Sequence, residues 1–151
     1  MLSFFRFAGC PLCNMRVHEL TKRYSELGED FSVVGVFNSS VENLKLHMDK
    51  HHAPFPMLAD KDRVYYKEYG VQYSLSGVIT GVTKRWSTVA KAFMKGYVPK
   101  SAEGNLLIMP AEFLVDRDGI IREVHYGQDE GDHMPFETIK AFALSQQEVS
   151  V

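Results

Sequence analysis

The sequence predicts an α/β domain with a mixed central sheet flanked by helices. Segments rich in Phe and β-branched residues alternate with segments whose apolar residues recur every three or four positions, so strands and helices interleave. A strand–turn–strand stretch near the end adds an antiparallel pair, which makes the sheet mixed. The length of 151 residues and the apolar fraction of 45% suit a single domain over residues 1–151.

The first part of the chain is predicted to hold two strand–helix units. Residues 2–7 form a short Phe-rich strand, and the helix that follows has an apolar stripe that ends near Gly28. Residues 31–37 form a second strand with several β-branched side chains. Ser39 and Glu42 have the spacing of a capping box and predict the start of a second helix.

The middle of the chain is predicted to be less regular. Pro54 and Pro56 interrupt the pattern, and a short helix follows over residues 60–69. The Gly and Ser residues within 71–84 predict a loop.

A further helix is predicted after this loop. Apolar residues recur at helical spacing from Trp86 to Phe93. Both of these aromatic residues are expected to be buried core residues of that helix. Residues 71–104, approximately, therefore form a helical insert ahead of the strand that follows Pro110.

The end of the chain is predicted to form a hairpin and a last helix. Residues 111–116 and 120–126 have the composition of strands, and the Asp-Gly pair between them is typical of a tight turn. Pro135 lies in the first turn of the last helix. The residues expected to face inward are Phe136, Ile139 and Ala143.

Charge and composition exclude several classes of function. The chain has 17 Lys and Arg against 19 Asp and Glu, and it lacks the basic excess of a nucleic-acid binder. No apolar run approaches the ~20 residues that span a bilayer, so we expect no membrane partner. Arg6 interrupts the apolar start, and neither a basic leader nor a cleavage site accompanies it, which predicts a cytoplasmic protein.

The two cysteines of the chain are the strongest indication of function. Cys13 shares a helix face with Val17 and Leu20 and is expected to point into the core, whereas Cys10 is expected to be accessible at the helix start. A helix N-terminus favours the reactive thiolate, and Pro11 suits the first helical position. The pair predicts a dithiol centre in which Cys10 attacks an oxidised substrate and Cys13 closes an internal disulfide.

Other interpretations of these residues remain open. Two buried, inert thiols are one alternative, and a non-catalytic binding module that uses the helical insert is another. The distance in sequence from the cysteines to His51 and His52 does not fit zinc-finger spacing, so we predict neither a metal nor a cofactor. Arg6 is placed either to stabilise the Cys10 thiolate or to face solvent.

Four stretches resemble the thioredoxin-like superfamily, and more closely its peroxiredoxin-like branch of alkyl hydroperoxide reductases and thiol-specific antioxidant proteins: FFRFAGCPLC, LADKDRVYYKEYGV, MPAEFLVDRDG and GQDEGDHMPF. The resemblance implies a thioredoxin-like fold, a peroxide or disulfide substrate and a thioredoxin- or glutathione-type reductant. It implies a cis peptide bond at Pro110, facing the redox centre. Relatives carry residues ahead of the first strand, so an abbreviated N-terminal edge and a homodimer are expected.

The sequence departs from the Pro-x-x-x-Thr-x-x-Cys motif of this family. If Cys13 is aligned with the motif cysteine, Cys10 and Arg6 occupy the Thr and Pro positions. If Cys10 is aligned instead, those positions hold Phe7 and Ser3. The hydroxyl that polarises a peroxide is therefore missing, and both the substrate and the identity of the attacking cysteine stay open.

Overall fold

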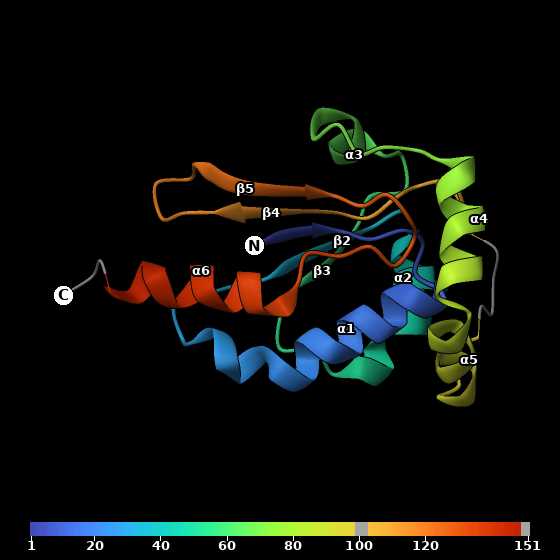
Figure 1. Ribbon diagram of the computed structural model, residues 1–151, viewed down its shortest axis with the longest axis horizontal. Helices are drawn as coiled ribbons and strands as arrows, with labels where there is room; N and C mark the ends of the chain where they lie inside the picture. Colours follow the sequence, from blue (N-terminus) through green and yellow to red (C-terminus); the bar gives the residue numbers. More distant parts are fainter. Residues whose placement is uncertain (99–102, 149–151) are drawn as a thin grey trace.

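A mixed five-stranded sheet lies at the centre of the computed structural model, which describes residues 1–98 and 103–148 (Figure 1). Neighbouring strands follow the order β3–β2–β1–β4–β5, and the first three are parallel to one another. β4 is antiparallel to both β1 and β5. The α/β class with a mixed sheet is confirmed. The strands are β1 (Leu2–Phe4), β2 (Val34–Phe37), β3 (Met57–Ala59), β4 (Ala111–Val115) and β5 (Ile121–Tyr126).

The sequence does not predict β3, because two prolines directly precede it. Pro54 and Pro56 indicate a break in regular structure, yet they lie outside the strand rather than within it. Gly35 donates its N–H to the carbonyl of Pro56 at 3.0 Å, so the proline still contributes an acceptor to the ladder. β3 is an edge strand, where a missing N–H costs the sheet little.

Helices cover both faces of the sheet and one of its ends (Figure 1). α1, α2 and α6 pack on one face, the short α3 lies on the other, and α4 and α5 stand across the end of the sheet. The helices are α1 (Pro11–Arg23), α2 (Val41–Met48), α3 (Val64–Glu68), α4 (Leu75–Lys84), α5 (Trp86–Met94) and α6 (Phe136–Glu148), with short 3₁₀ turns at Tyr24–Leu27 and Asp49–His51.

The prediction of a loop for residues 71–84 is wrong, because most of this segment is α4. The Ser74 hydroxyl caps the helix by accepting the N–H of Gly77 at 2.9 Å. Gly77 and Gly81 face the body of the protein, and a Cβ on either would lie within 2.6 Å of a side chain, Glu130 in the case of Gly81. These glycines permit close packing, which sequence alone does not distinguish from chain flexibility.

α5 forms where its spacing predicts a helix, but its apolar stripe faces outward. Ala92 is fully buried, whereas Trp86 is 70% exposed and Phe93 is 47% exposed. The prediction that both aromatic residues are core is therefore wrong. Periodicity shows that a stripe exists, and it does not show which side of the helix meets the protein. Residues 99–102 of the predicted insert lie outside the described residues.

The second predicted helix begins one residue later than its capping box indicates. Ser40 is the capping residue, since its hydroxyl accepts the N–H of Asn43 at 3.2 Å. The Ser39 hydroxyl instead accepts the N–H of Ala8 at 3.0 Å. Ser39 thereby ties the start of α2 to the loop that precedes Cys10.

The hairpin and the last helix are confirmed. Asp116 accepts the N–H groups of Asp118 and Ile120 at 2.9 Å each, which closes the turn between β4 and β5. In α6 the residues predicted to face inward are buried: Phe136, Ile139 and Ala143.

β3 and β5 form the two edges of the sheet, and β1 lies at its centre. An edge strand presents unpaired backbone groups to other chains, so the homodimer stays a prediction. Within residues 1–98 and 103–148, no helix is both long and apolar enough to cross a bilayer.

Candidate active site

Cys10 and Cys13 lie at the junction of β1 and α1. Cys10 is the capping residue of α1, with φ −63° and ψ 121°, and Pro11 occupies the first turn as predicted. The carbonyl of Cys10 accepts the N–H of Asn14 at 3.0 Å, so the helix begins directly at this cysteine. The first turn of α1 carries no acidic residue, which leaves the positive end of the helix dipole free to act on the Cys10 sulfur.

Both cysteines are free and fully buried. Cys13 packs into the main core with Val17 and Leu20, as predicted. The accessible position expected for Cys10 is wrong. Segments distant in the sequence lie beside this junction: the carbonyls of Leu106 and Ile108 and the carboxylate of Glu130 contact Arg6, and a Cβ on Gly131 would lie 3.3 Å from Leu12 Cδ1.

Arg6 is the principal charged neighbour of Cys10. Its Nη1 lies 3.4 Å from the Cys10 sulfur and 3.0 Å from a carboxylate oxygen of Glu130. Its Nε donates to the carbonyl of Ile108 at 2.9 Å, and its Nη2 donates to the carbonyl of Leu106. Of the two positions that the sequence allows for Arg6, the structure has the one beside the thiol.

The pKa values of the two cysteines move in opposite directions. Burial raises the pKa of Cys10, but the hydrogen bond from the Cys13 thiol and the charge of Arg6 outweigh burial and lower that pKa to about 5. Burial also raises the pKa of Cys13, and the adjacent Cys10 sulfur raises it further. At neutral pH Cys10 is therefore a thiolate and Cys13 a thiol.

Glu130 is a site residue that the sequence did not indicate. Its side chain is 6% exposed, and its carboxylate contacts the same guanidinium nitrogen of Arg6 as the Cys10 sulfur does. Burial raises the pKa of Glu130, while Arg6 lowers it and Cys10 raises it. No sequence pattern connects the polar loop after β5 with Arg6. Residues 6 and 130 are brought together only when the chain folds.

A second ion pair joins this loop to the α4–α5 unit. Arg85 Nε lies 2.7 Å from Asp129 Oδ1, which also accepts the N–H of Gly131 at 2.9 Å. A Cβ on Gly131 would lie 2.6 Å from Arg85 Cδ, so the two segments are in close contact. α4 therefore packs against the loop that carries Glu130, and α5 packs against α1.

Two cavities lie beside the segments that bury the centre. One, of about 330 Å³, is lined in part by Leu12, Arg85 and Gly131. The other, of about 630 Å³, is lined in part by Asn38 and Leu106. Neither cysteine lines either cavity, so a substrate reaches Cys10 only when a covering segment moves.

Pro110 does not form the cis peptide bond that the resemblance implies, since all peptide bonds among the described residues are trans. Its carbonyl accepts the N–H of Gly127 at 2.9 Å, so the chain enters β4 in extended form. Trans is the intrinsically favoured isomer of such a bond, and this path needs no turn. Pro110 lies two residues from Ile108, whose carbonyl accepts a hydrogen bond from Arg6.

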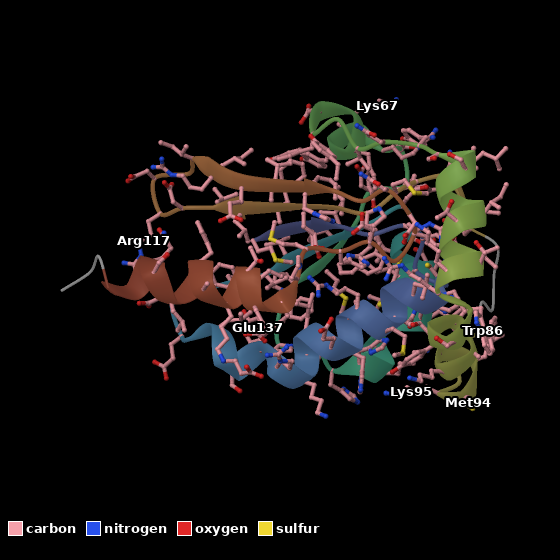
Figure 2. The ribbon with its side chains drawn as sticks, viewed as in Figure 1. Lys67, Trp86, Met94, Lys95, Arg117 and Glu137 are labelled. Carbon is pink, nitrogen blue, oxygen red and sulfur yellow. The ribbon has the colours of Figure 1, made fainter. Side chains whose placement is uncertain are left out.

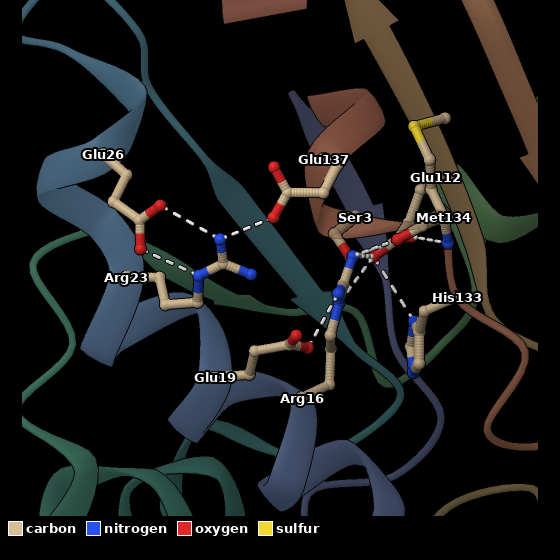
Figure 3. A network of polar contacts seen from close by, with 9 residues as sticks. All are labelled: Ser3, Arg16, Glu19, Arg23, Glu26, Glu112, His133, Met134 and Glu137. Carbon is tan, nitrogen blue, oxygen red and sulfur yellow. Dashed lines mark hydrogen bonds and ion pairs between the residues drawn. The ribbon is translucent and has the colours of Figure 1, made fainter. Parts of the chain in front are cut away.

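A second buried charge cluster is centred on Glu112 of β4 (Figure 3). Glu112 accepts hydrogen bonds from Arg16 Nη2 at 3.1 Å and from the N–H of Met134 at 2.6 Å. Ser3 Oγ donates at 3.2 Å, and His133 Nδ1 lies 3.3 Å away. Burial raises the pKa of Glu112, but Arg16 and His133 outweigh it and lower the pKa to about 2. The cluster joins β1, α1 and β4 to the chain leading into α6.

No three His, Cys, Asp or Glu side chains come together as metal ligands in the described part of the chain. His51, which the metal alternative would require, instead pairs with Asn14 at 2.9 Å. Asn14 donates to the carbonyls of Ala8 and Cys10 at 2.8 and 2.9 Å. His51 therefore supports the backbone around Cys10.

Comparison with known proteins gives one family and several structures of the same fold. The profile of the AhpC/TSA family matches residues 1–124. No curated protein matches the chain.

Three of the similar structures are a peroxidoxin and two peroxiredoxins. The peroxidoxin BcpB of Mycobacterium tuberculosis aligns over 99% of this chain and 78% of its own, with 15% identity and a TM-score of 0.62. Peroxiredoxin Q of Xanthomonas campestris, as a cysteine-to-serine mutant, aligns over 99% and 78%, with 12% identity and a TM-score of 0.63. A cysteine-to-serine mutant of peroxiredoxin 6 of Arenicola marina aligns over 99% and 61%, with 12% identity and a TM-score of 0.69.

Proposed function

We propose, since the chain belongs to the AhpC/TSA family of thiol-dependent peroxidases, that Cys10 is the thiolate that attacks a peroxide and that Cys13 resolves the product. One observation carries this assignment. The Cys10 sulfur lies 3.4 Å from Arg6 Nη1, and Arg6 and Cys13 together hold the pKa of Cys10 at about 5. The thiolate is the nucleophilic form, and Cys10 alone of the two adopts it at neutral pH.

In the first step the Cys10 thiolate gives an electron pair to the terminal oxygen of a hydroperoxide. The S–O bond forms as the O–O bond breaks, which leaves a sulfenic acid on Cys10 and an alkoxide that takes a proton from solvent. The sulfur is oxidised and the peroxide is reduced by two electrons. The guanidinium of Arg6 supplies N–H donors and positive charge where the leaving oxygen becomes negative.

In the second step Cys13 attacks the sulfenic acid. The S–S bond forms, hydroxide leaves Cys10, and the proton of Cys13 completes a water molecule. Conversion of the Cys10 thiolate into a neutral sulfenic acid removes the negative charge that raises the pKa of Cys13. Cys13 is therefore held as a thiol until the first step has occurred.

The burial of both cysteines favours a peroxide over a protein disulfide as the oxidant. Each cysteine has no exposed surface. A small hydroperoxide needs a modest displacement of the residues packed around Cys10, whereas a protein disulfide needs the sulfur at the surface. Arg6 replaces the missing hydroxyl of the family motif as the group that polarises the peroxide.

The family implies a thioredoxin-type reductant, which returns the Cys10–Cys13 disulfide to the dithiol with two electrons. A glutathione-type reductant is the alternative for this chain. We place the cycle in the cytoplasm, where such reductants keep thiols reduced.

Rapid mixing of the reduced protein with hydrogen peroxide, followed by mass spectrometry, tests the assignment. Cys10→Ser should abolish the fast reaction. Cys13→Ser should react once and stop at a sulfenic acid that a dimedone-type reagent traps. The wild type should lose two hydrogens and form the internal disulfide. Fast oxidation in Cys10→Ser and its loss in Cys13→Ser would instead make Cys13 the attacking residue.

A further inference from the structure

Most of the large apolar side chains of α4 and α5 face solvent rather than the protein, although Val89 packs against the main core. The buried residues of these helices are small, namely Gly77, Gly81 and Ala92. A helix on a globular protein normally directs its apolar stripe inward. The outward stripe, here called the α4–α5 apolar face, comprises Leu75 (65% exposed), Ile79 (60%), Val82 (50%), Trp86 (70%), Phe93 (47%) and Met94 (80%). Trp86 and Met94 project from this end of the molecule (Figure 2).

The geometry of α4 makes this orientation a built feature. Positions 75, 79 and 82 are separated by four and three residues, which places them on one side of α4, and Trp86 begins α5 shortly after it. The opposite side carries Gly77 and Gly81, where a Cβ would lie 2.6 Å and 2.4 Å from neighbouring side chains. Rotating α4 to bury its apolar side would bring large residues into this contact, for which there is no space.

Residues 69–102, which include α4 and α5, carry a positive net charge, whereas the whole chain is negative. Residues 69–102 contain no Asp or Glu, although the chain has a formal net charge of −2. Lys84, Lys91 and Lys95 are exposed beside the apolar face. Within the described residues 69–98, Arg85 forms an ion pair with Asp129, and the charge of Lys84 also acts on that carboxylate.

We propose that the α4–α5 apolar face binds the surface of an anionic lipid bilayer, with its apolar side chains among the headgroups and its lysines against the lipid phosphates. An exposed apolar stripe, an exposed tryptophan and flanking lysines are the features of helices that lie in a membrane interface. Anionic lipid attracts each such lysine over a distance of about a Debye length.

Charge favours a bilayer over a second copy of the chain as the occupant. A two-fold contact through this face would bring the same patch of each copy together and place lysines near lysines. The expectation of no membrane partner depends on the absence of a membrane-spanning segment. That absence does not exclude a helix that lies on the membrane surface. The proposal is independent of the peroxidase chemistry.

Trp86 is the single tryptophan of the chain and reports directly on this contact. Adding vesicles of phosphatidylglycerol and phosphatidylcholine to the full-length protein should move its emission to shorter wavelengths, and brominated lipid should quench it. Pure phosphatidylcholine vesicles should have much less effect, and added salt should weaken the response. No shift with anionic vesicles, or an equal shift with neutral ones, would overturn the proposal. So would a lipid-independent shift that rises with protein concentration and accompanies a dimer in sedimentation.

Co-sedimentation of variants with the same vesicles tests the face itself. Ile79→Glu should weaken binding about tenfold or more, because it places a carboxylate in the apolar contact. Lys91→Gln should weaken binding about fivefold through the loss of one cation. Val124→Glu on β5, at a position 47% exposed, is the matched control and should bind as the wild type does. Equal losses in Val124→Glu and Ile79→Glu would contradict the proposed face, and peroxide assays on the same samples report separately on the redox centre.

Discussion

Two buried arginines, Arg6 and Arg16, each meet a buried glutamate, yet the two clusters differ in how their charges are compensated. Glu112 accepts hydrogen bonds from donors on several elements, and its pKa is lowered to about 2. Arg6 instead divides its N–H groups among Glu130, two carbonyls and the sulfur of Cys10. The first cluster has a lasting ionic partner, whereas the second has a partner whose charge changes during the reaction. Arg16 therefore stabilises the fold, whereas Arg6 acts on the reactive thiolate.

The largest expected effect is the loss of stability in Glu112→Gln. The change leaves Arg16 buried without its counter-ion, so the free energy of unfolding should fall by about 3–5 kcal/mol in urea denaturation at pH 7. The folded-state pKa of Glu112, about 2, lies below its ordinary value of 4.5. The stabilisation is thus present above pH 4.5 and is lost as the pH falls from 4.5 towards 2, so the gap between wild type and variant should narrow over that range.

Glu19→Gln is the control for this measurement. Glu19 pairs with Arg16 at 2.9 Å, but its side chain is 43% exposed. Solvent screening should limit its effect to less than about 1 kcal/mol. Similar losses in the Glu19 and Glu112 variants would show that Glu112 is not the principal partner of Arg16.

The next effect is on reactivity, in Arg6→Met. Loss of the guanidinium charge should raise the pKa of Cys10 from about 5 towards the ordinary value of about 8.5. The thiolate fraction at pH 7 would then be about 3%, and the reaction with peroxide should slow roughly 30-fold. Stopped-flow rates across a pH series measure both quantities. Arg6→Lys keeps the charge but not the forked donor, so its Cys10 pKa and its rate should lie between those of the wild type and Arg6→Met. An unchanged Cys10 pKa in Arg6→Met would refute the assigned role of Arg6.

The smallest effect is expected for Glu130→Gln, the counterpart of Glu112→Gln in the redox cluster. Arg6 keeps the Cys10 thiolate as an anionic partner, so the free energy of unfolding should change by about 1 kcal/mol or less. Removing the neighbouring carboxylate should lower the pKa of Cys10 slightly. The rate at pH 7 should barely change, because Cys10 is already ionised, and the difference should emerge in alkylation rates measured below pH 6. A loss of stability as large as that of Glu112→Gln would make the two clusters equivalent.

Most of the fold could be predicted because the chain has strong local patterns. Apolar spacing located α1, α6 and the hairpin, and the apolar face of α1 placed Cys13 in the core. The errors fell where one local signal fits two structures. Glycines at positions 77 and 81 suit a flexible loop as well as a closely packed helix. The stripe of α5 predicts a core helix as well as one that faces solvent.

About half of the redox centre could be predicted in the same way. The spacing of Cys10 and Cys13 at a helix start indicates dithiol chemistry, and Arg6 is close enough in sequence to be considered beside them. Glu130 could not be predicted, because it belongs to a loop far along the chain. The burial of Cys10 could not be predicted either, since residues distant in the sequence provide its cover.

Local order along the chain thus accounts for the strands other than β3, the helix that starts at Cys10 and the core position of Cys13. These depend on interactions within a few residues, which composition and spacing record. The tertiary structure determines the buried position of Arg6 between thiolate and carboxylate and the outward face of α4 and α5. Each of these depends on which distant segment packs against which side, and no local pattern in the chain encodes that.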